Sequence, residues 1–226
     1  MLVSSENFEN GRTPGWVFGR TDFAPAFTRF LGRYGKNDGG RYPSKVFHVP
    51  RNAKELVLEF DFYEIDSWDK SHRDYLCIVF DGKMVDIETF DTHQSENGRG
   101  TTRNGVRFQV RSLTNPANIG FTHWKDQKHR VTMHVPPSYY QADGQVKIEF
   151  QARLSEAIHN ESAGYDNIRL TAKFNCRRRK LRGNGDMDDF TEDEVAVVDG
   201  GSEEPQYFMG DAVDTFEDDS TNYLRG

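Results

Sequence analysis

Apolar and polar residues alternate with a period of two along most of the first 175 residues. The clearest example is residues 56–62 (Leu-Val-Leu-Glu-Phe-Asp-Phe), where leucine and phenylalanine take one face of an extended chain and Glu59 and Asp61 take the other. This alternation predicts half-buried β-strands, each with one face in the core and one in water. The predicted strands cover residues 27–34, 45–49, 56–62, 74–80, 83–90, 105–111, 129–135, 145–153 and 166–174.

Turn sequences separate several of these strands. Asp81-Gly82, Asn104-Gly105 and Asp143-Gly144 each favour a tight reversal of the chain. Residues 91–104 have no periodicity and predict a long surface loop. Many short strands without a long helical pattern predict an all-β fold, an antiparallel β-sandwich of the jelly-roll type.

Charge divides the chain into two parts. Residues 1–182 hold 28 Lys and Arg against 22 Asp and Glu, whereas residues 183–226 hold one basic and 14 acidic residues. The formal net charge of -7 therefore combines a basic body with an acidic tail. We expect a sandwich domain over 1–176, a basic hinge over 177–182 and an extended acidic tail over 183–226.

The acidic tail has too few apolar residues to form a core that offsets the entropy of ordering, roughly 1–2 kcal/mol per residue. Because its charge is opposite to that of the body, we expect it to bind a partner subunit, which gives a homo-oligomer or a filament. The apolar side chains expected to contact the partner are Phe190, Val197, Tyr207, Phe208, Phe216 and Tyr223.

The hinge, Arg177-Arg178-Arg179-Lys180-Leu181-Arg182, also resembles a dibasic processing site. No basic helix or aromatic platform accompanies it, so we expect no nucleic-acid binding. No run of about 18 apolar residues predicts insertion into a membrane, and residues 1–4 lack the features of a signal peptide. Cys77 and Cys176 are too few for a disulfide framework or a four-cysteine zinc site, and whether they pair stays open.

The two ends of the body carry a recognisable pattern. Asn7-Phe8-Glu9-Asn10-Gly11 with Gly15-Trp16, and Gly164-Tyr165-Asp166-Asn167-Ile168 near the other end, resemble the first and last strands of calcium-binding carbohydrate-binding modules and MAM-type extracellular domains. In those families the two strands are neighbours and hold a structural Ca²⁺. The resemblance implies that Glu9 and Asp166 are its carboxylate ligands, with backbone carbonyls supplying the remaining oxygens.

A second segment, Asp61-Phe62-Tyr63-Glu64-Ile65-Asp66-Ser67-Trp68-Asp69, resembles a group of extracellular β-sandwich repeats of protists, algae and marine bacteria. The final strand of that group has tryptophan where this chain has Ala163. Asp66 and Asp69 are three residues apart in a turn, and a third carboxylate from Glu161 would favour a hard cation there. The alternative is that these acids are solvated loop residues.

One pattern suggests an enzyme. Glu59, Asp61 and Glu64 match the Glu-x-Asp-x-x-Glu pattern of laminarinase-like glycosidases, whose two catalytic carboxylates lie close together. A regular strand places Glu64 on the opposite face from the other two. The seven histidines do not converge, and no phosphate-binding loop or nucleophile elbow is present. We therefore expect no catalytic activity.

The sequence thus predicts a calcium-stabilised structural or adhesion protein outside the cell or at its surface, which assembles through its tail. The sequon at Asn160 is consistent with a glycoprotein. The alternative function is a glycan-binding module. Its candidate aromatic residues are Trp124, Tyr139 and Tyr140, which are equally well explained as core residues.

Overall fold

The computed structural model describes residues 1–174, apart from residues 73, 92–94, 96, 122, 123, 141 and 142. The predicted hinge, the acidic tail with its six partner-binding residues, and Cys176 lie outside the described residues. Cys77 is buried on a central strand, 3.5 Å from the Oε1 atom of Gln151.

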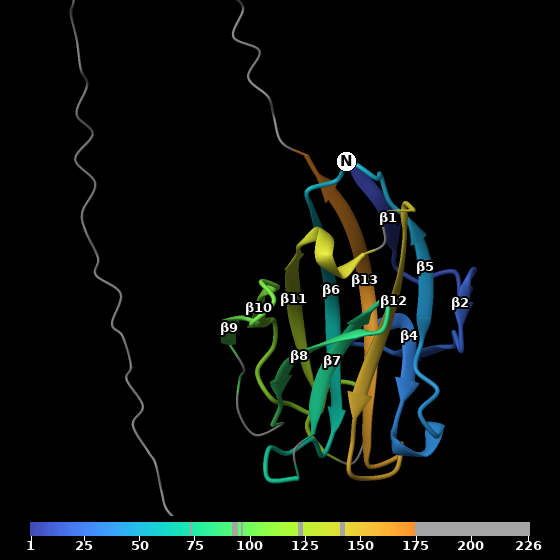
Figure 1. The fold of residues 1–226 in the computed structure, drawn as a ribbon. Coiled ribbons are helices and arrows are strands. Elements are labelled where there is room, and N and C mark those ends of the chain that lie inside the picture. Colours follow the sequence, from blue (N-terminus) through green and yellow to red (C-terminus); the bar gives the residue numbers. More distant parts are fainter. Residues whose placement is uncertain (73, 92–94, 96, 122–123, 141–142, 175–226) are drawn as a thin grey trace, which may run out of the picture. The chain divides into compact units, whose positions relative to one another are not determined.

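Two antiparallel sheets form the described part of the chain (Figure 1), as the alternation predicts. One sheet has the order β3-β4-β13-β6-β11-β10-β9, with β1 also paired to β13. Its strands are β1 (Leu2–Glu6), β3 (Thr21–Ala24), β4 (Thr28–Tyr34), β6 (Glu55–Asp66), β9 (Asn97–Thr101), β10 (Arg107–Ser112), β11 (Gln127–Val135) and β13 (Glu161–Lys173).

The second sheet has the order β2-β5-β12-β7-β8. Its strands are β2 (Trp16–Val17), β5 (Ser44–His48), β12 (Gln145–Arg153), β7 (Tyr75–Phe80) and β8 (Lys83–Thr89). The described helices are two single 3₁₀ turns, η1 (Lys36–Asp38) and η2 (Pro137–Tyr139). Neither has the length and apolar character that crossing a membrane requires.

The inner faces of the two sheets share one hydrophobic core, so the molecule is a β-sandwich. Phe60 of β6 meets Phe150 of β12 edge to face, with ring centroids 5.1 Å apart, and Tyr165 of β13 lies at the same distance from Phe150. The leucine and phenylalanine residues of β6 that the alternation assigned to the core are all fully buried. The predicted all-β sandwich is confirmed.

Strand β13, the last described strand, lies beside the first strand, β1. It pairs with β6 along one edge, and along its other edge with β4 and then β1. Ser5 is opposite Arg169, and the amino group of Met1 donates a hydrogen bond to the carbonyl oxygen of Ala172. The first and last strands are therefore neighbours (Figure 1).

The predicted loop over residues 91–104 contains a strand, so that part of the prediction is wrong. β9 pairs with β10 through a turn closed by a hydrogen bond from the Thr102 amide to the Val106 carbonyl. Gly105 takes a φ of 84° in this turn, which glycine adopts without strain. Glycine at positions 98 and 100 hid the strand, because glycine has no apolar side chain and leaves no alternation. Glycine is needed at position 100, since a Cβ there would lie 2.5 Å from the Phe108 ring.

The outer face of β6 is not uniformly wet, which corrects a second expectation. Asp61 is 4 % exposed, and Tyr63 and Ile65 belong to a smaller apolar cluster with Phe27 and Phe30. Phe27 stacks on Tyr63 with ring centroids 4.5 Å apart. This outer cluster covers one end of the sheet and places apolar surface beside the carboxylate of Asp166.

Candidate functional site

Asp166 lies on β13 at a bulge, where the pairing with β6 shifts between Asp166 and Arg169. The residue is 2 % exposed, and its Oδ1 atom has no hydrogen-bond partner in the described part of the chain. Its Oδ2 atom accepts hydrogen bonds from the Tyr63 hydroxyl at 3.1 Å and from the Asn167 side chain at 3.3 Å. A buried carboxylate oxygen without a donor is costly, and such an atom calls for a proton or a cation.

Glu9 approaches this site from the turn that follows β1. The turn is closed by a hydrogen bond from the Gly11 amide to the Phe8 carbonyl at 2.8 Å, with Gly11 at a φ of 70°. The Oε1 atom of Glu9 lies 2.5 Å from the Thr28 hydroxyl, which is also 2.6 Å from the Phe27 carbonyl oxygen. That carbonyl is 3.3 Å from the Tyr63 hydroxyl.

These contacts make a continuous chain of oxygens from Glu9 through Thr28, Phe27 and Tyr63 to Asp166. The chain has four oxygen–oxygen contacts, but only two hydroxyl hydrogens are available to fill them. A cation that coordinates several of the oxygens would remove this shortage. Thr28 and the Phe27 carbonyl are site groups that the sequence motifs did not reveal.

Burial and two neighbouring charges raise the pKa of Asp166. Loss of hydration is the largest cause, and the charges of Asp61 and Glu9 add to it, which brings the pKa to about 7. Asp61 itself forms an ion pair with the Arg130 guanidinium and accepts a hydrogen bond from the Asn167 side chain at 2.8 Å. Glu9 and Asp166 are thus the carboxylates of this site that form no ion pair with another described residue.

Among the described residues, no three His, Cys, Asp or Glu side chains are arranged so as to hold a metal ion by themselves. The oxygens available here are two carboxylates, two hydroxyls and one backbone carbonyl. Calcium accepts this mixture, because it binds six to eight oxygens of different kinds and commonly includes carbonyls and water. The residues present therefore fit a calcium ion better than a thiolate- or imidazole-binding metal.

The other predicted group, Asp66, Asp69 and Glu161, is divided among several contacts. Glu161 of β13 is opposite Asp66 of β6 in the register of the two strands. The Asp66 carboxylate accepts a hydrogen bond from the Trp124 amide, while its own amide donates to Asp126. The Asp69 carboxylate accepts hydrogen bonds from the backbone and side chain of His72.

Asp74, which no sequence motif identified, interacts with the carboxyl group of Glu161. Both carboxyl groups are buried, and each accepts hydrogen bonds from the loop at 155–156. Burial is the main cause that raises the pKa of both groups, and their interaction brings the pKa of Glu161 to about 7. Two buried carboxyl groups that interact in this way favour a state in which they hold one proton between them, because two negative charges would repel each other.

This proton makes a testable contribution to stability. Glu161 has a higher pKa when folded than when unfolded, so stability is lost as the pH rises from about 4.5 to about 7. We expect Glu161→Gln to flatten this part of the pH profile and to raise the melting temperature at pH 8 relative to the wild type. Thermal denaturation in chelator at pH 5 and pH 8 measures both effects. Asp86→Asn, at an exposed carboxylate, is the control. An unchanged pH profile in the glutamine variant would contradict the shared proton.

The aromatic candidates for glycan binding differ in exposure. Tyr139 is buried and packs against Phe80, so it is a core residue. Tyr140 is half-buried and donates a hydrogen bond to the Ala53 carbonyl. Trp124 is 50 % exposed.

Asn160, the residue of the glycosylation sequon, is half-buried and its side chain donates a hydrogen bond to Glu156.

The carboxylates of the Glu-x-Asp-x-x-Glu pattern do not converge. Glu64 is fully buried on the inner face of β6, where it contacts His129 at 2.9 Å. Glu59 and Asp61 lie on the outer face, opposite Thr132 and Arg130 of β11. Burial lowers the pKa of His129 to about 3, so the imidazole is neutral at ordinary pH.

The fold and this site define a class: an antiparallel β-sandwich with an oxygen-rich candidate cation site between its last described strand and the turn after its first strand. No known family model matches the chain, and no curated protein matches it significantly.

Proposed function

We propose that the protein is a non-catalytic, calcium-stabilised β-sandwich that serves a structural or adhesive role outside the cell or at its surface. The observation that carries this proposal is the buried carboxylate of Asp166. Within the described residues its Oδ1 atom has no hydrogen-bond donor, and its Oδ2 atom is joined to Glu9 by a chain of oxygens. Calcium would supply a double positive charge at that point and would link β13 to the turn after β1.

The class of calcium site supports the proposed location. A site with two carboxylates and otherwise neutral oxygens has few negative charges. Calcium affinity is lower when fewer of the ligands are charged. Extracellular modules bind calcium with dissociation constants of about 10⁻⁴ to 10⁻³ M. A weak site of this kind is filled where calcium is abundant.

Assembly through the acidic tail completes the proposal. The tail carries 14 acidic residues and one basic residue, and the body has the opposite charge balance. Opposite charges on one chain favour association of the tail of one copy with the body of another, and this becomes a filament when the rotation does not close.

Light scattering on the full chain in calcium tests the assembly. We expect a species larger than a monomer, which dissociates at high salt because surface charges are then screened. Removal of residues 183–226 should leave a monomer of unchanged melting temperature. A full-length control in which the acidic residues of the tail become Asn and Gln separates charge from length. Equal particle sizes for all three proteins would rule out the tail as the linking element.

The second candidate function is glycan binding. Trp124 offers half of its surface to solvent, and its amide is fixed by the Asp66 carboxylate. A rigid, exposed indole is a common platform for the apolar face of a sugar. The outer face of the eight-stranded sheet provides a longer polar surface for such a ligand.

A further inference from the structure

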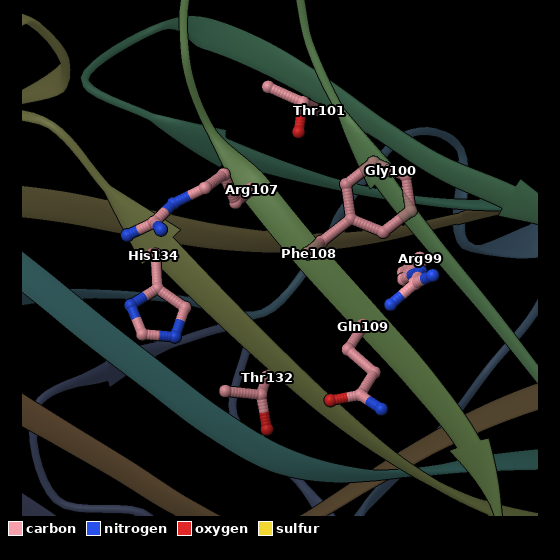
Figure 2. A pocket seen from close by; sticks show the side chains of 8 residues that line it. All are labelled: Arg99, Gly100, Thr101, Arg107, Phe108, Gln109, Thr132 and His134. Carbon is pink, nitrogen blue, oxygen red and sulfur yellow. The ribbon is translucent and has the colours of Figure 1, made fainter. Parts of the chain in front are cut away.

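Three adjoining hollows lie along the outer face of the eight-stranded sheet. The first, of about 510 Å³, lies over β9, β10 and β11 and is lined by Arg99, Thr101, Arg107, Gln109, Thr132 and His134, together with the edge of Phe108 and Gly100 (Figure 2). A second shares Gln109 and Thr132 with it, and a third, towards β1, shares Arg130 with the second. We call these three adjoining hollows together the arginine groove.

Strand register explains why its residues share one face. Gln109 of β10 is opposite both Arg99 of β9 and Thr132 of β11. The row continues from Thr132 to Glu59 of β6, and from Glu59 to Arg169 of β13. Neighbouring strands are about 4.8 Å apart, so this row of five strands spans roughly 19 Å across the sheet. The groove thus suits an extended ligand that lies across the strands.

The groove contains more positive than negative charge. Its five arginines are Arg99, Arg107, Arg111, Arg130 and Arg169. The acids in or beside it are Glu6, Glu55, Glu59 and Asp61, of which Glu6 pairs with Lys45. Arg107 pairs with Glu55 at 2.7 Å and Arg130 pairs with Asp61. Within the described residues, no carboxylate forms an ion pair with the other three arginines, all of which are exposed.

We propose that the arginine groove binds an acidic polysaccharide, one that carries sulfate or carboxylate groups along an extended chain. The planar guanidinium forks of Arg99, Arg111 and Arg169 match the geometry of these anions. The amide of Gln109 and the hydroxyl of Thr132 lie between them and are suited to sugar hydroxyls. This inference rests on the glycan-binding candidate and specifies its ligand class; it is independent of the assembly through the tail.

An acidic peptide fits the groove less well. The predicted tail of this chain, for example, has aromatic side chains among its acids, and these need apolar pockets on the surface that binds them. Phe108 is the aromatic residue of the groove, and it packs against the core. A ligand that presents anions and hydroxyls without apolar anchors therefore matches the groove better.

Titration calorimetry with three oligosaccharides tests the proposal on the full chain: a sulfated heparin fragment, a carboxylated oligogalacturonate and a neutral glucan. We expect at least one acidic probe to bind and the neutral glucan not to bind in the groove. The triple variant Arg99→Ser, Arg111→Ser, Arg169→Ser should weaken that binding at least tenfold. The control Arg12→Ser, Arg41→Ser, Arg51→Ser removes the same charge from exposed arginines outside the groove and should leave the affinity within about twofold.

Each contrary outcome is distinguishable. Equal weakening in both triple variants would mean attraction to net charge alone and would overturn the groove. Binding of the neutral glucan that is lost in Trp124→Ala, with no effect of the arginine variants, would keep the glycan-binding candidate and remove the groove. No binding of any probe would remove both. Displacement of an acidic probe by a peptide of residues 183–226 at equal or lower concentration would identify the tail as the occupant instead.

Discussion

Transfer of the protein from calcium into a chelator at pH 8 is expected to lower the melting temperature by about 5–10 °C. An ion present at about 100 times its dissociation constant stabilises the folded state by about 2.7 kcal/mol. For a domain of this size, 1 kcal/mol corresponds to about 2–4 °C. Differential scanning calorimetry at several calcium concentrations measures the shift.

The calcium effect should depend on pH in a defined direction. Without calcium, Asp166 has a pKa of about 7 when folded, so stability is lost as the pH rises from about 4 to about 7. Calcium binds the deprotonated carboxylate and competes with the proton. The stabilisation by calcium should therefore be small at pH 5.5 and should approach its full size at pH 8.

The variant Asp166→Asn separates the ion from the proton. It removes the buried charge but keeps a side chain that accepts a hydrogen bond from Tyr63. We expect it to melt at the same temperature with and without calcium, and above the wild type in chelator at pH 8. Glu9→Gln should also lose the calcium effect, whereas Glu156→Gln should retain it. A calcium-dependent melting temperature in Asp166→Asn would place the ion elsewhere, and no calcium effect in the wild type would rule out the site.

Replacement of Trp68 by alanine is expected to lower the free energy of unfolding by about 3–5 kcal/mol. Trp68 is fully buried between Phe62 and Phe90, and its indole nitrogen donates a hydrogen bond to the Ser162 carbonyl at 2.8 Å. The substitution leaves a large cavity near the start of β13 and removes the hydrogen bond to the Ser162 carbonyl. Urea denaturation followed by circular dichroism measures the change.

Two further variants define the origin of that loss. Trp68→Phe keeps most of the ring volume but loses the hydrogen bond to Ser162, and it should cost less than the alanine variant. Trp124→Ala, at a tryptophan with half of its surface exposed, should change stability by about 0.5 kcal/mol or less. If Trp68→Ala costs no more than Trp124→Ala, Trp68 is not part of the core that the structure assigns to it.

Local patterns were sufficient to predict most of the sandwich. Each of the nine predicted strands corresponds to an observed one, because alternation reflects the burial of one face and needs no knowledge of the partner strand. β9 was missed because its inward positions are glycine, so no alternation is visible. The outer apolar cluster on β6 was missed because the side chains that cover Tyr63 come from distant loops.

The candidate site was predictable only in part. Glu9 and Asp166 were found by their resemblance to a known pattern, and the pairing of β1 with β13 is consistent with it. The Phe27 carbonyl has no sequence signal, since any residue carries a carbonyl. Thr28 lies outside both sequence motifs. Asp74 was missed because its proximity to Glu161 depends on a loop closure between residues 87 positions apart in the sequence.

The position of β13 between β6 on one side and β4 and β1 on the other also determines when the sheet can fold during synthesis. Pairing along both edges of β13 brings together residues separated by up to 171 positions, so the eight-stranded sheet cannot be completed until the ribosome has released the last strand. Until then, β6 has an open edge next to its run of leucine and phenylalanine residues. A nascent or prematurely terminated chain that lacks residues 161–173 should therefore depend on chaperones to avoid aggregation.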